Sequence, residues 1–327
     1  MRIEIWADVV CPWAYIGKRR LERAPLGEDV EVVWRPYRVD PAAPARAVPL
    51  EEALEEVLQD PAAGESLAAC SPGLAPQDNR ARVARIAADE GLGPVWGAAW
   101  RADSHGAHRL IALAYAEGGA ELQDAVVEGV LRAHFVEALD ISAPDVLEGV
   151  AREAGFADGA RLLAGGAGED LVRELVLTGK AMGVRTSPTF VVRGRALAGA
   201  QSPEAIAEFV RYAAGQEVRG LPEEVERLRH AESLLEQRDP LGALVLLRPL
   251  LESHGEDRGV RMLAARAYFA SAQLGRATRE LEGLVSEAPD DSYARLLLGR
   301  TLRRRGLEGE AAVHLSLAAV MSPHYAG

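Results

Sequence analysis

The 327-residue sequence contains little cysteine and few aromatic residues. Two cysteines, Cys11 and Cys70, cannot cross-link a chain of this length, which excludes a disulfide-stabilised scaffold. Phe, Trp and Tyr make up 5% of the residues, so the core must consist mainly of Leu, Val and Ala, as it does in packed helices. The hydrophobic content of 48% and the charged content of 26% are those of a globular protein and exclude disorder over most of the length.

Long apolar runs are absent as well. No uncharged apolar stretch of about 18 residues occurs that could span a membrane, and residues 1–6 lack the apolar segment of a signal peptide. Acidic side chains outnumber basic ones by 49 to 37, and the net charge of −12 would repel a phosphate backbone. We therefore expect a cytoplasmic protein with neither a membrane nor a nucleic acid as partner. Because cytoplasmic thiols are kept reduced, a conspicuous cysteine there is more often chemical than structural.

Residues 1–215 show the succession of strands and helices that is typical of an α/β domain. Alternating apolar residues, or runs rich in β-branched and aromatic residues, predict strands over residues 3–8, 30–39, 188–192 and 196–200. Helices are predicted over residues 15–24, 50–59, 79–90, 105–117, 122–137, 144–154, 158–183 and 203–214, the last one capped by Ser202. The pattern therefore predicts an α/β layer into which a helical domain is inserted, at about residues 45–183.

After residue 215 the pattern changes to helices alone and repeats every 34 residues. Small or apolar residues recur at this spacing in four series: Ala231, Ala265 and Gly299; Leu234, Tyr268 and Leu302; Ala243, Ala277 and Ala311; Leu247, Leu281 and Leu315. Pro289 and Pro323 have the same spacing and end two of the units. This period resembles the tetratricopeptide repeat, in which small residues let paired helices approach closely. We predict three such repeats in the all-α region 216–327.

Cys11 is the strongest candidate for a catalytic residue. It follows the first predicted strand, and Pro12 suits the first turn of the next helix, so Cys11 lies at a helix N-terminus. The unpaired N–H groups and the partial positive charge there favour a thiolate, which predicts a depressed pKa for Cys11. Trp13 can shield the sulfur, and Lys18 adds positive charge from farther away. Alternatively, Cys11 is a buried and unreactive residue at the end of a strand.

The segment around Cys11, IEIWADVVCPWAYIGK over residues 3–18, resembles the opening of the FrnE-like branch of the DsbA family. Members of that family are thioredoxin-fold enzymes with a helical insertion, related to kappa-class glutathione transferases and 2-hydroxychromene-2-carboxylate isomerases. Further similar segments follow in order at residues 34–37, 107–111, 183–192 and 198–201. The resemblance covers residues 1–215 and implies a thioredoxin-like α/β fold with a large helical insertion.

The resemblance also implies which residues surround the sulfur. Pro188 matches the cis-proline of the family, and Ser187 precedes it in the loop that faces the active-site cysteine and binds extended substrates. Pro12 and Trp13 complete the expected substrate-binding set. Judged on local sequence alone, Ser187 and Pro188 could equally be an ordinary start of a strand.

The sequence departs from the family at one position. Ala14 replaces the second cysteine of the dithiol motif, so no thiol in the motif can resolve a mixed disulfide formed at Cys11. Cys70 is the one remaining thiol, and nothing in its spacing places it near Cys11. We expect Cys11, not Cys70, to be the reactive residue.

Other chemistry-bearing residues are less informative. His105 and His108 lie one helical turn apart, but no cysteine or carboxylate completes a zinc-binding spacing, so we expect no metal site. His108 could line a pocket, although packing or capping is the more ordinary role. Trp96 and Trp100, also one turn apart, suit either core packing or an apolar cleft. The sequence contains no glycine-rich nucleotide loop and no nucleophile elbow.

These observations favour a cytoplasmic thiol–disulfide oxidoreductase or isomerase of the DsbA family that acts through Cys11 alone. We expect no bound cofactor, with a low-molecular-weight thiol as a candidate co-substrate. The expected partners are a protein or small-molecule thiol or disulfide, and a protein on the repeats. Two other functions stay open. One is a thiol-cofactor-dependent isomerase or transferase, and the other is a redox-inactive peptide-binding module whose repeats recruit a partner.

Overall fold

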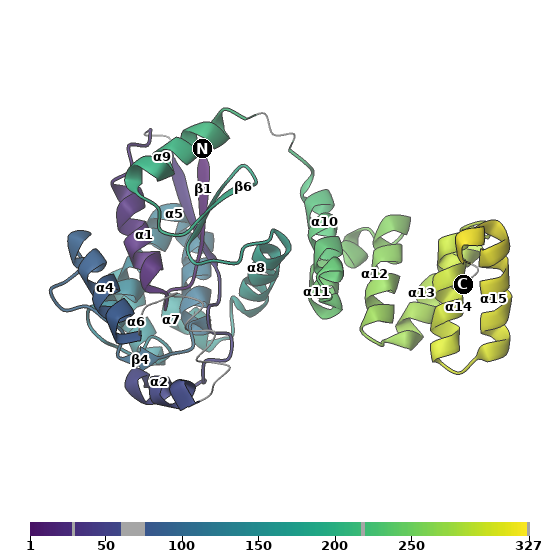
Figure 1. Cartoon of the computed structure of the whole chain (residues 1–327), viewed down its shortest axis with the longest axis horizontal. Coiled ribbons are helices and arrows are strands. Elements are labelled where there is room, and N and C mark those ends of the chain that lie inside the picture. Colours follow the sequence, from purple (N-terminus) through teal and green to yellow (C-terminus); the bar gives the residue numbers. More distant parts are fainter. Residues whose placement is uncertain (28–29, 60–75, 217–219, 326–327) are drawn as a thin grey trace. The chain divides into compact units, whose positions relative to one another are not determined.

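The structure, a computed structural model, describes residues 1–27, 30–59, 76–216 and 220–325 (Figure 1). The chain divides into two compact units. One unit contains Met1–Gly179 and Val184–Val218, and the other contains Lys180–Gly183 and Arg219–Gly327. The predicted insertion includes residues 180–183, whereas these four residues group with the helical repeats in the structure.

The first unit is built on a mixed four-stranded sheet. Its strands are β1 (Arg2–Ala7), β2 (Glu31–Pro36), β5 (Thr189–Val192) and β6 (Arg195–Ala198), in the order β2-β1-β5-β6. β1 is parallel to β2 and antiparallel to β5, which forms an antiparallel hairpin with β6. β1 is therefore a central strand, and the residues that follow it emerge from the middle of the sheet.

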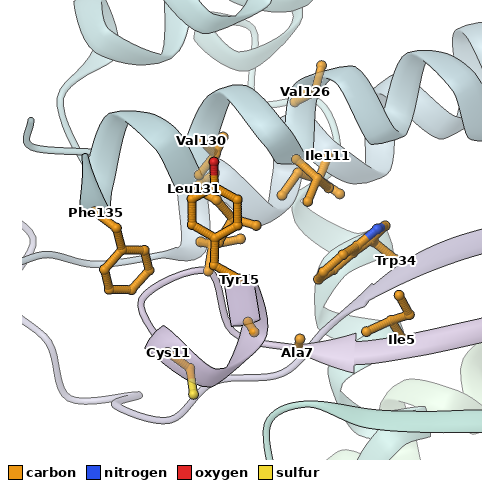
Figure 2. Close-up of a cluster of buried hydrophobic side chains, with 14 of the residues drawn as sticks. Ile5, Ala7, Cys11, Tyr15, Trp34, Ile111, Val126, Val130, Leu131 and Phe135 are labelled. Atoms are coloured by element: carbon orange, nitrogen blue, oxygen red, sulfur yellow. The ribbon is translucent and has the colours of Figure 1, made fainter. Parts of the chain in front are cut away.

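The main core covers one face of this sheet. Ile3, Ile5 and Ala7 alternate along β1 and all belong to this core, as the period of the sequence predicts. Figure 2 shows Ile5 and Ala7 in this cluster. The helices α1 (Pro12–Glu22), α5 (His105–Phe135) and α9 (Pro203–Ala214) pack against them. They contribute buried side chains that include Ile16, Leu21, Leu110, Leu131, Ile206 and Val210.

The opposite face of the sheet holds a smaller cluster. Trp6 of β1 packs there with Val184 and Val191 and is 1% exposed. The helix α8 (Glu169–Ala181) lies on this face (Figure 1). Its residue Gly179 lies against the indole ring of Trp6. A Cβ atom on Gly179 would lie 2.6 Å from the ring atom Cε3, so a glycine is required at this close approach.

The remaining elements of the unit lie in the insertion. They are β3 (Val48–Pro49), α2 (Leu50–Gln59), α4 (Pro76–Asp89), β4 (Trp100–Arg101), α6 (Pro144–Glu153) and α7 (Gly159–Ala164). The bounds of α2 are those predicted. The Ser202 hydroxyl caps α9 as predicted, because it accepts a hydrogen bond from the N–H of Ala205.

The two helices predicted over residues 105–117 and 122–137 are confirmed, because Gly119, with φ of 68° and ψ of −158°, interrupts the helical backbone within α5. Two other local predictions were wrong. The single helix predicted over residues 158–183 is broken into α7 and α8, because Gly166 and Gly168 adopt positive φ between them. The short antiparallel pair of β3 and β4 was not predicted, since two-residue strands carry no periodic signal.

The second unit consists of antiparallel helix pairs. Its helices are α10 (Glu223–Glu236), α11 (Pro240–Ser253), α12 (Arg258–Ala270), α13 (Leu274–Glu287), α14 (Ser292–Arg304) and α15 (Glu308–Met321). One predicted series of small residues lies in the first helix of each pair. Its members Ala231, Ala265 and Gly299 belong to α10, α12 and α14. A Cβ on Gly299 would meet Leu315 of α15 at 2.6 Å, which explains the small residue at this position. The 34-residue period is thus the period of the helix pairs.

Candidate active site

Cys11 occupies the junction between β1 and α1. The chain turns after β1, and the N–H of Cys11 donates to the carbonyl of Asp8 at 3.0 Å. Cys11 is the N-cap residue of α1, with extended backbone angles of −87° and 118°, and Pro12 is the first residue of the helix. The carbonyl of Cys11 accepts from the N–H of Ala14 at 2.9 Å. The side chain makes no capping hydrogen bond, so the sulfur is left for other partners.

The loop before β5 supplies such a partner. The peptide bond between Ser187 and Pro188 is cis, as the resemblance implies, and the Cys11 thiol donates to the Ser187 carbonyl with a sulfur–oxygen distance of 3.4 Å. The Ser187 hydroxyl accepts from the N–H of Asp8 at 2.9 Å. Gly17 allows α1 to approach closely, because a Cβ there would lie 2.9 Å from Cγ of Pro188. Ser187 is 176 residues from Cys11 in sequence. The fold therefore brings Ser187 and Pro188 to Cys11.

The ionisation of Cys11 differs from the sequence-based prediction. Cys11 is only 9% exposed, and this burial raises the pKa of its thiol above the ordinary value. The nearby polar groups of Ser187 and of the Trp13 and Ala14 backbone favour the thiolate and act in the opposite direction, but burial outweighs them. The predicted depression of this pKa was therefore wrong, because a helix N-terminus stabilises a thiolate less than the loss of water destabilises it here.

The charge of Lys18 is also compensated within the fold. The side chain of Lys18 is 4% exposed, and its Nζ lies 2.5 Å from Glu22, 3.1 Å from Asp124 and 3.2 Å from Glu128. Glu128 also pairs with Arg19 and accepts a hydrogen bond from Tyr15. These groups tie α1 to α5, so the basic run of α1 supports the fold and adds no free positive charge near the sulfur.

The position of the missing second thiol is filled by a methyl group. Ala14 is completely buried in the first turn of α1. Cys11 is the free cysteine of the described residues, and Cys70 lies outside them. The structure therefore places no second sulfur beside Cys11 within the parts of the chain that it describes.

A groove opens beside the N-terminus of α1. It has a volume of about 510 Å³ and is lined mainly by apolar side chains, which include Val10, Pro12, Trp13, Val83, Trp96 and Phe135. The rings of Trp96 and Phe135 stack with their centroids 4.9 Å apart, and Arg82 lies over the ring of Trp13. Trp96 is thus part of the groove, whereas Trp100 donates its indole N–H to the carbonyl of Ala138. Pro12 and Trp13, the two residues after Cys11 in the sequence, line the groove, whereas Cys11 itself does not.

Two buried polar residues near Cys11 were not singled out as a pair from the sequence. Asp8 is completely buried, and its Oδ1 lies 3.3 Å from Nε2 of His108, which is 3% exposed. The other oxygen of Asp8 accepts from the N–H of Val39 at 2.6 Å. Burial alone would raise the pKa of the Asp8 carboxyl, but the contacts with His108 and Val39 outweigh it and lower the pKa. Asp8 directly follows β1, and its partner His108 lies 100 residues later in α5, so no local pattern in the sequence signalled the pair.

Among the residues that the structure describes, no three or more His, Cys, Asp or Glu side chains come together as a metal site requires. His105 pairs with Glu169 at 2.9 Å, whereas His108 pairs with Asp8. None of the described helices is long and apolar enough to cross a membrane.

Comparison with known families agrees with the fold. Residues 2–211 match the DSBA-like thioredoxin domain. The chain belongs to this family. Residues 234–301 match the tetratricopeptide repeat, which confirms the predicted repeats of the second unit. The thioredoxin-like fold with a helical insertion, followed by helical repeats, is thereby confirmed as well.

Individual relatives of this DSBA-like chain are distant. The uncharacterised protein YwbO of Bacillus subtilis (strain 168) is 35% identical over 52 residues, which cover 16% of this chain and about a quarter (26%) of YwbO. The crystal structure of a probable DsbA oxidoreductase from Streptomyces coelicolor is similar with a TM-score of 0.54 and 26% identity, over 68% of this chain and 93% of that one. A 2-hydroxychromene-2-carboxylate isomerase is matched with a TM-score of 0.43 and 16% identity, over 66% and 95% of the two chains.

Proposed function

We propose that this protein is a cytoplasmic thiol–disulfide oxidoreductase or isomerase that acts through Cys11 alone. The observation that carries the proposal is the contact of the Cys11 sulfur with the Ser187 carbonyl before cis-Pro188, at the N-terminus of α1. Ala14, buried three residues later, cannot supply a second thiol. This arrangement suits chemistry that needs one nucleophile and does not suit oxidation by an internal dithiol.

The reaction is a pair of thiol–disulfide exchanges. The thiolate of Cys11 attacks one sulfur of a substrate disulfide, forms a mixed disulfide and releases the other substrate sulfur as a thiolate, which takes up a proton. A low-molecular-weight thiol then attacks the substrate sulfur of the mixed disulfide, and Cys11 leaves as a thiolate. The two steps exchange disulfide partners, so no bound cofactor takes part and the small thiol is a co-substrate.

The groove beside α1 supports a substrate with an apolar group next to its reacting sulfur. Trp13 and Pro12 line the groove and flank Cys11 in sequence, while the stacked rings of Trp96 and Phe135 form another part of its wall. The same groove favours a second candidate function. A thiol cofactor held near Cys11 could react with an aromatic substrate in the groove, as in a thiol-dependent isomerase or transferase.

We also propose that the repeats bind a protein partner. Four apolar side chains of α15 are exposed, namely Val313, Leu317, Val320 and Met321. The positions 34 residues earlier in α13 hold Arg279, Gly283, Ser286 and Glu287. The corresponding positions of α13 carry no apolar side chain, so the apolar face of α15 suits a surface that a partner covers. We expect a protein partner to co-purify with Arg279→Lys but to be lost from Val320→Lys. Equal recovery of that partner with both variants would contradict the proposal.

Intact-mass analysis tests the proposed chemistry. The full chain is exposed to an oxidised small thiol and to a disulfide-containing peptide, alongside the Cys11→Ser and Cys70→Ser variants. We expect one adduct on wild type and on Cys70→Ser, none on Cys11→Ser, and release of the adduct by free thiol. A small-thiol adduct together with binding of an aromatic ligand would favour the isomerase or transferase. No adduct on Cys11 with either reagent would refute both.

A further inference from the structure

The groove beside α1 combines apolar walls with a single charged side chain. Among the lining residues that the structure describes, Arg80 is the one with a charge and Asn79 the one with an amide. The aromatic lining residues are Trp13, Trp96 and Phe135, and the others are small or aliphatic. A small-molecule site of this kind binds the body of its ligand by apolar contact, while its few polar groups fix the orientation of the ligand.

Arg80 is available to such a ligand. It lies near the N-terminus of α4, its side chain is exposed, and no carboxylate of the described residues pairs with it. Residues 79–88 of α4 contain three arginines and no acidic residue. Of the other two arginines, Arg82 lies over the ring of Trp13, and Arg85 is exposed outside the groove. In a chain with a net charge of −12, this stretch of α4 therefore gives the groove a local positive charge.

The groove also lies beside the reacting residue. Val10 and Pro12, the neighbours of Cys11 in sequence, line it, and α4 packs against α1. A ligand whose sulfur reaches Cys11 can therefore place the rest of its structure in the groove that Arg80 lines. The volume of about 510 Å³ is within the range of sites for small molecules, so the groove suits a small thiol or disulfide better than a folded protein.

We propose that Arg80 is a specificity-determining residue and that the small-molecule substrate of Cys11 is an aromatic thiol or disulfide with a carboxylate group. The aromatic ring packs against Trp13, Trp96 and Phe135, and the carboxylate accepts hydrogen bonds from the guanidinium of Arg80. The inference rests on the proposed reaction at Cys11 and names the class of its small substrate. The thiolate of Cys11 attacks one sulfur of the disulfide, and the other sulfur leaves as an aromatic thiolate with the electron pair of the broken bond.

The two parts of the groove recognise different parts of the ligand. The planar guanidinium of an arginine can donate two parallel hydrogen bonds to one carboxylate. The apolar walls bind the ring and reduce the local polarity, which strengthens those hydrogen bonds. A neutral aromatic disulfide uses the walls alone, and an anionic aliphatic disulfide uses Arg80 alone. A ligand with both features is therefore preferred over either of these.

The test compares two aromatic disulfides of different charge, the anionic dithiobis(nitrobenzoate) and the neutral dithiodipyridine. Each releases an absorbing thiol when Cys11 attacks it, and the rates are measured at pH 7 in full-length protein with Cys70→Ser. The ratio of the anionic to the neutral rate cancels any change in the reactivity of Cys11 itself. We expect Arg80→Gln to lower this ratio about tenfold, the effect of one hydrogen bond to a charged group. Arg80→Lys keeps the charge but not the paired hydrogen bonds, so it should lower the ratio less.

Arg85→Gln is the matched control, because it removes the same charge from the same helix outside the groove and should leave the ratio unchanged. A second measurement does not depend on the reaction. Naphthoate has the ring and the carboxylate but no sulfur, and it should quench tryptophan fluorescence, since Trp13 and Trp96 line the groove. We expect this quenching in wild type and Arg85→Gln, and much less of it in Arg80→Gln.

A ratio that Arg80→Gln leaves unchanged, or that Arg85→Gln lowers equally, would overturn the inference. The proposed reaction fails separately, if neither disulfide reacts with Cys11. In that case the quenching by naphthoate decides alone whether Arg80 binds an anion in the groove. Reaction of Cys11 with both disulfides, without any dependence on Arg80, would remove the inference and keep the reaction.

Discussion

At the scale of single residues, Ala14 decides which exchange reactions Cys11 can complete. A lone attacking thiol produces a mixed disulfide that persists until another thiol arrives, so wild type should reduce insulin poorly. Ala14→Cys places a second sulfur one helical turn from Cys11, within reach of a disulfide. We expect the variant to form an internal disulfide and to gain dithiol-dependent insulin reduction. Because Ala14 is completely buried, the added atom should cost about 1 kcal/mol or more of stability.

The control for this variant is Ala14→Ser, which adds an atom of similar position without a thiol and should gain no activity. Cys70→Ser should leave the activity of wild type and of Ala14→Cys nearly unchanged. Wild-type insulin turnover that disappears in Cys70→Ser would instead identify Cys70 as the resolving thiol. Mass analysis under non-reducing conditions distinguishes the two disulfides.

A second residue-scale prediction concerns acid. Burial lowers the pKa of His134 to about 4, whereas an unfolded chain holds histidine near 6.5. From about one unit above pH 6.5 the imidazole is almost entirely neutral in both states, and stability no longer depends on it. As the pH falls from about 6.5 towards 4, the unfolded chain takes up a proton that the folded chain does not, so stability is lost, by about 2 kcal/mol at pH 5.

Guanidinium unfolding at pH 7 and pH 5, followed by tryptophan fluorescence, measures this loss. All five tryptophans lie between residues 6 and 100, so the signal reports on the first unit. His134→Gln should lose about 2 kcal/mol less than wild type between the two pH values, whereas His105→Gln, at a partly buried position paired with Glu169, should behave more like wild type. An identical loss in wild type and His134→Gln would show that His134 is not the group responsible.

At the scale of elements, the closeness of α1 to the start of β5 shapes the site. Gly17→Ala would place a Cβ 2.9 Å from Pro188, so α1 and the cis-proline loop must separate. We expect a loss of about 1–3 kcal/mol in unfolding free energy and slower formation of the mixed disulfide at Cys11. Gly149→Ala in α6 is the control, since its nearest neighbour is the end of Arg152 at 4.0 Å, and helix propensity should make it neutral or stabilising. Equal effects of the two variants would contradict this account.

The elements that the sequence predicted well are those specified by their own residues. The N-cap residue and the first-turn proline of α9 can be recognised in the sequence, and the repeats can be recognised from their 34-residue period. Partners that meet across the fold carry no such local signal. His108 reaches Asp8 from 100 residues away, and the raised pKa of Cys11 follows from burial that no neighbouring residue reveals. The contact of Cys11 with Ser187 was available through resemblance alone.

At the scale of the whole molecule, the two units differ in what holds them together. The core of the first unit combines residues from the two ends of residues 1–215. It contains Ile3 of β1 and Ala213 of α9. A repeat array, by contrast, is stabilised between neighbouring helix pairs. The first unit should therefore unfold as one cooperative transition that does not need the repeats.

The fragment 1–215 tests this independence. It retains α9, whose buried Ile206, Val210 and Ala213 complete the core, and lacks the repeats with their Lys180–Asp239 ion pair. We expect it to be soluble, to unfold cooperatively in tryptophan fluorescence and to form the same adduct on Cys11 as the full chain. The fragment 1–201 is the matched control, because without α9 the core stays open and should not fold. If 1–215 is insoluble or unfolds without a cooperative transition, the repeats are part of the folding unit and the boundary near residue 215 is wrong.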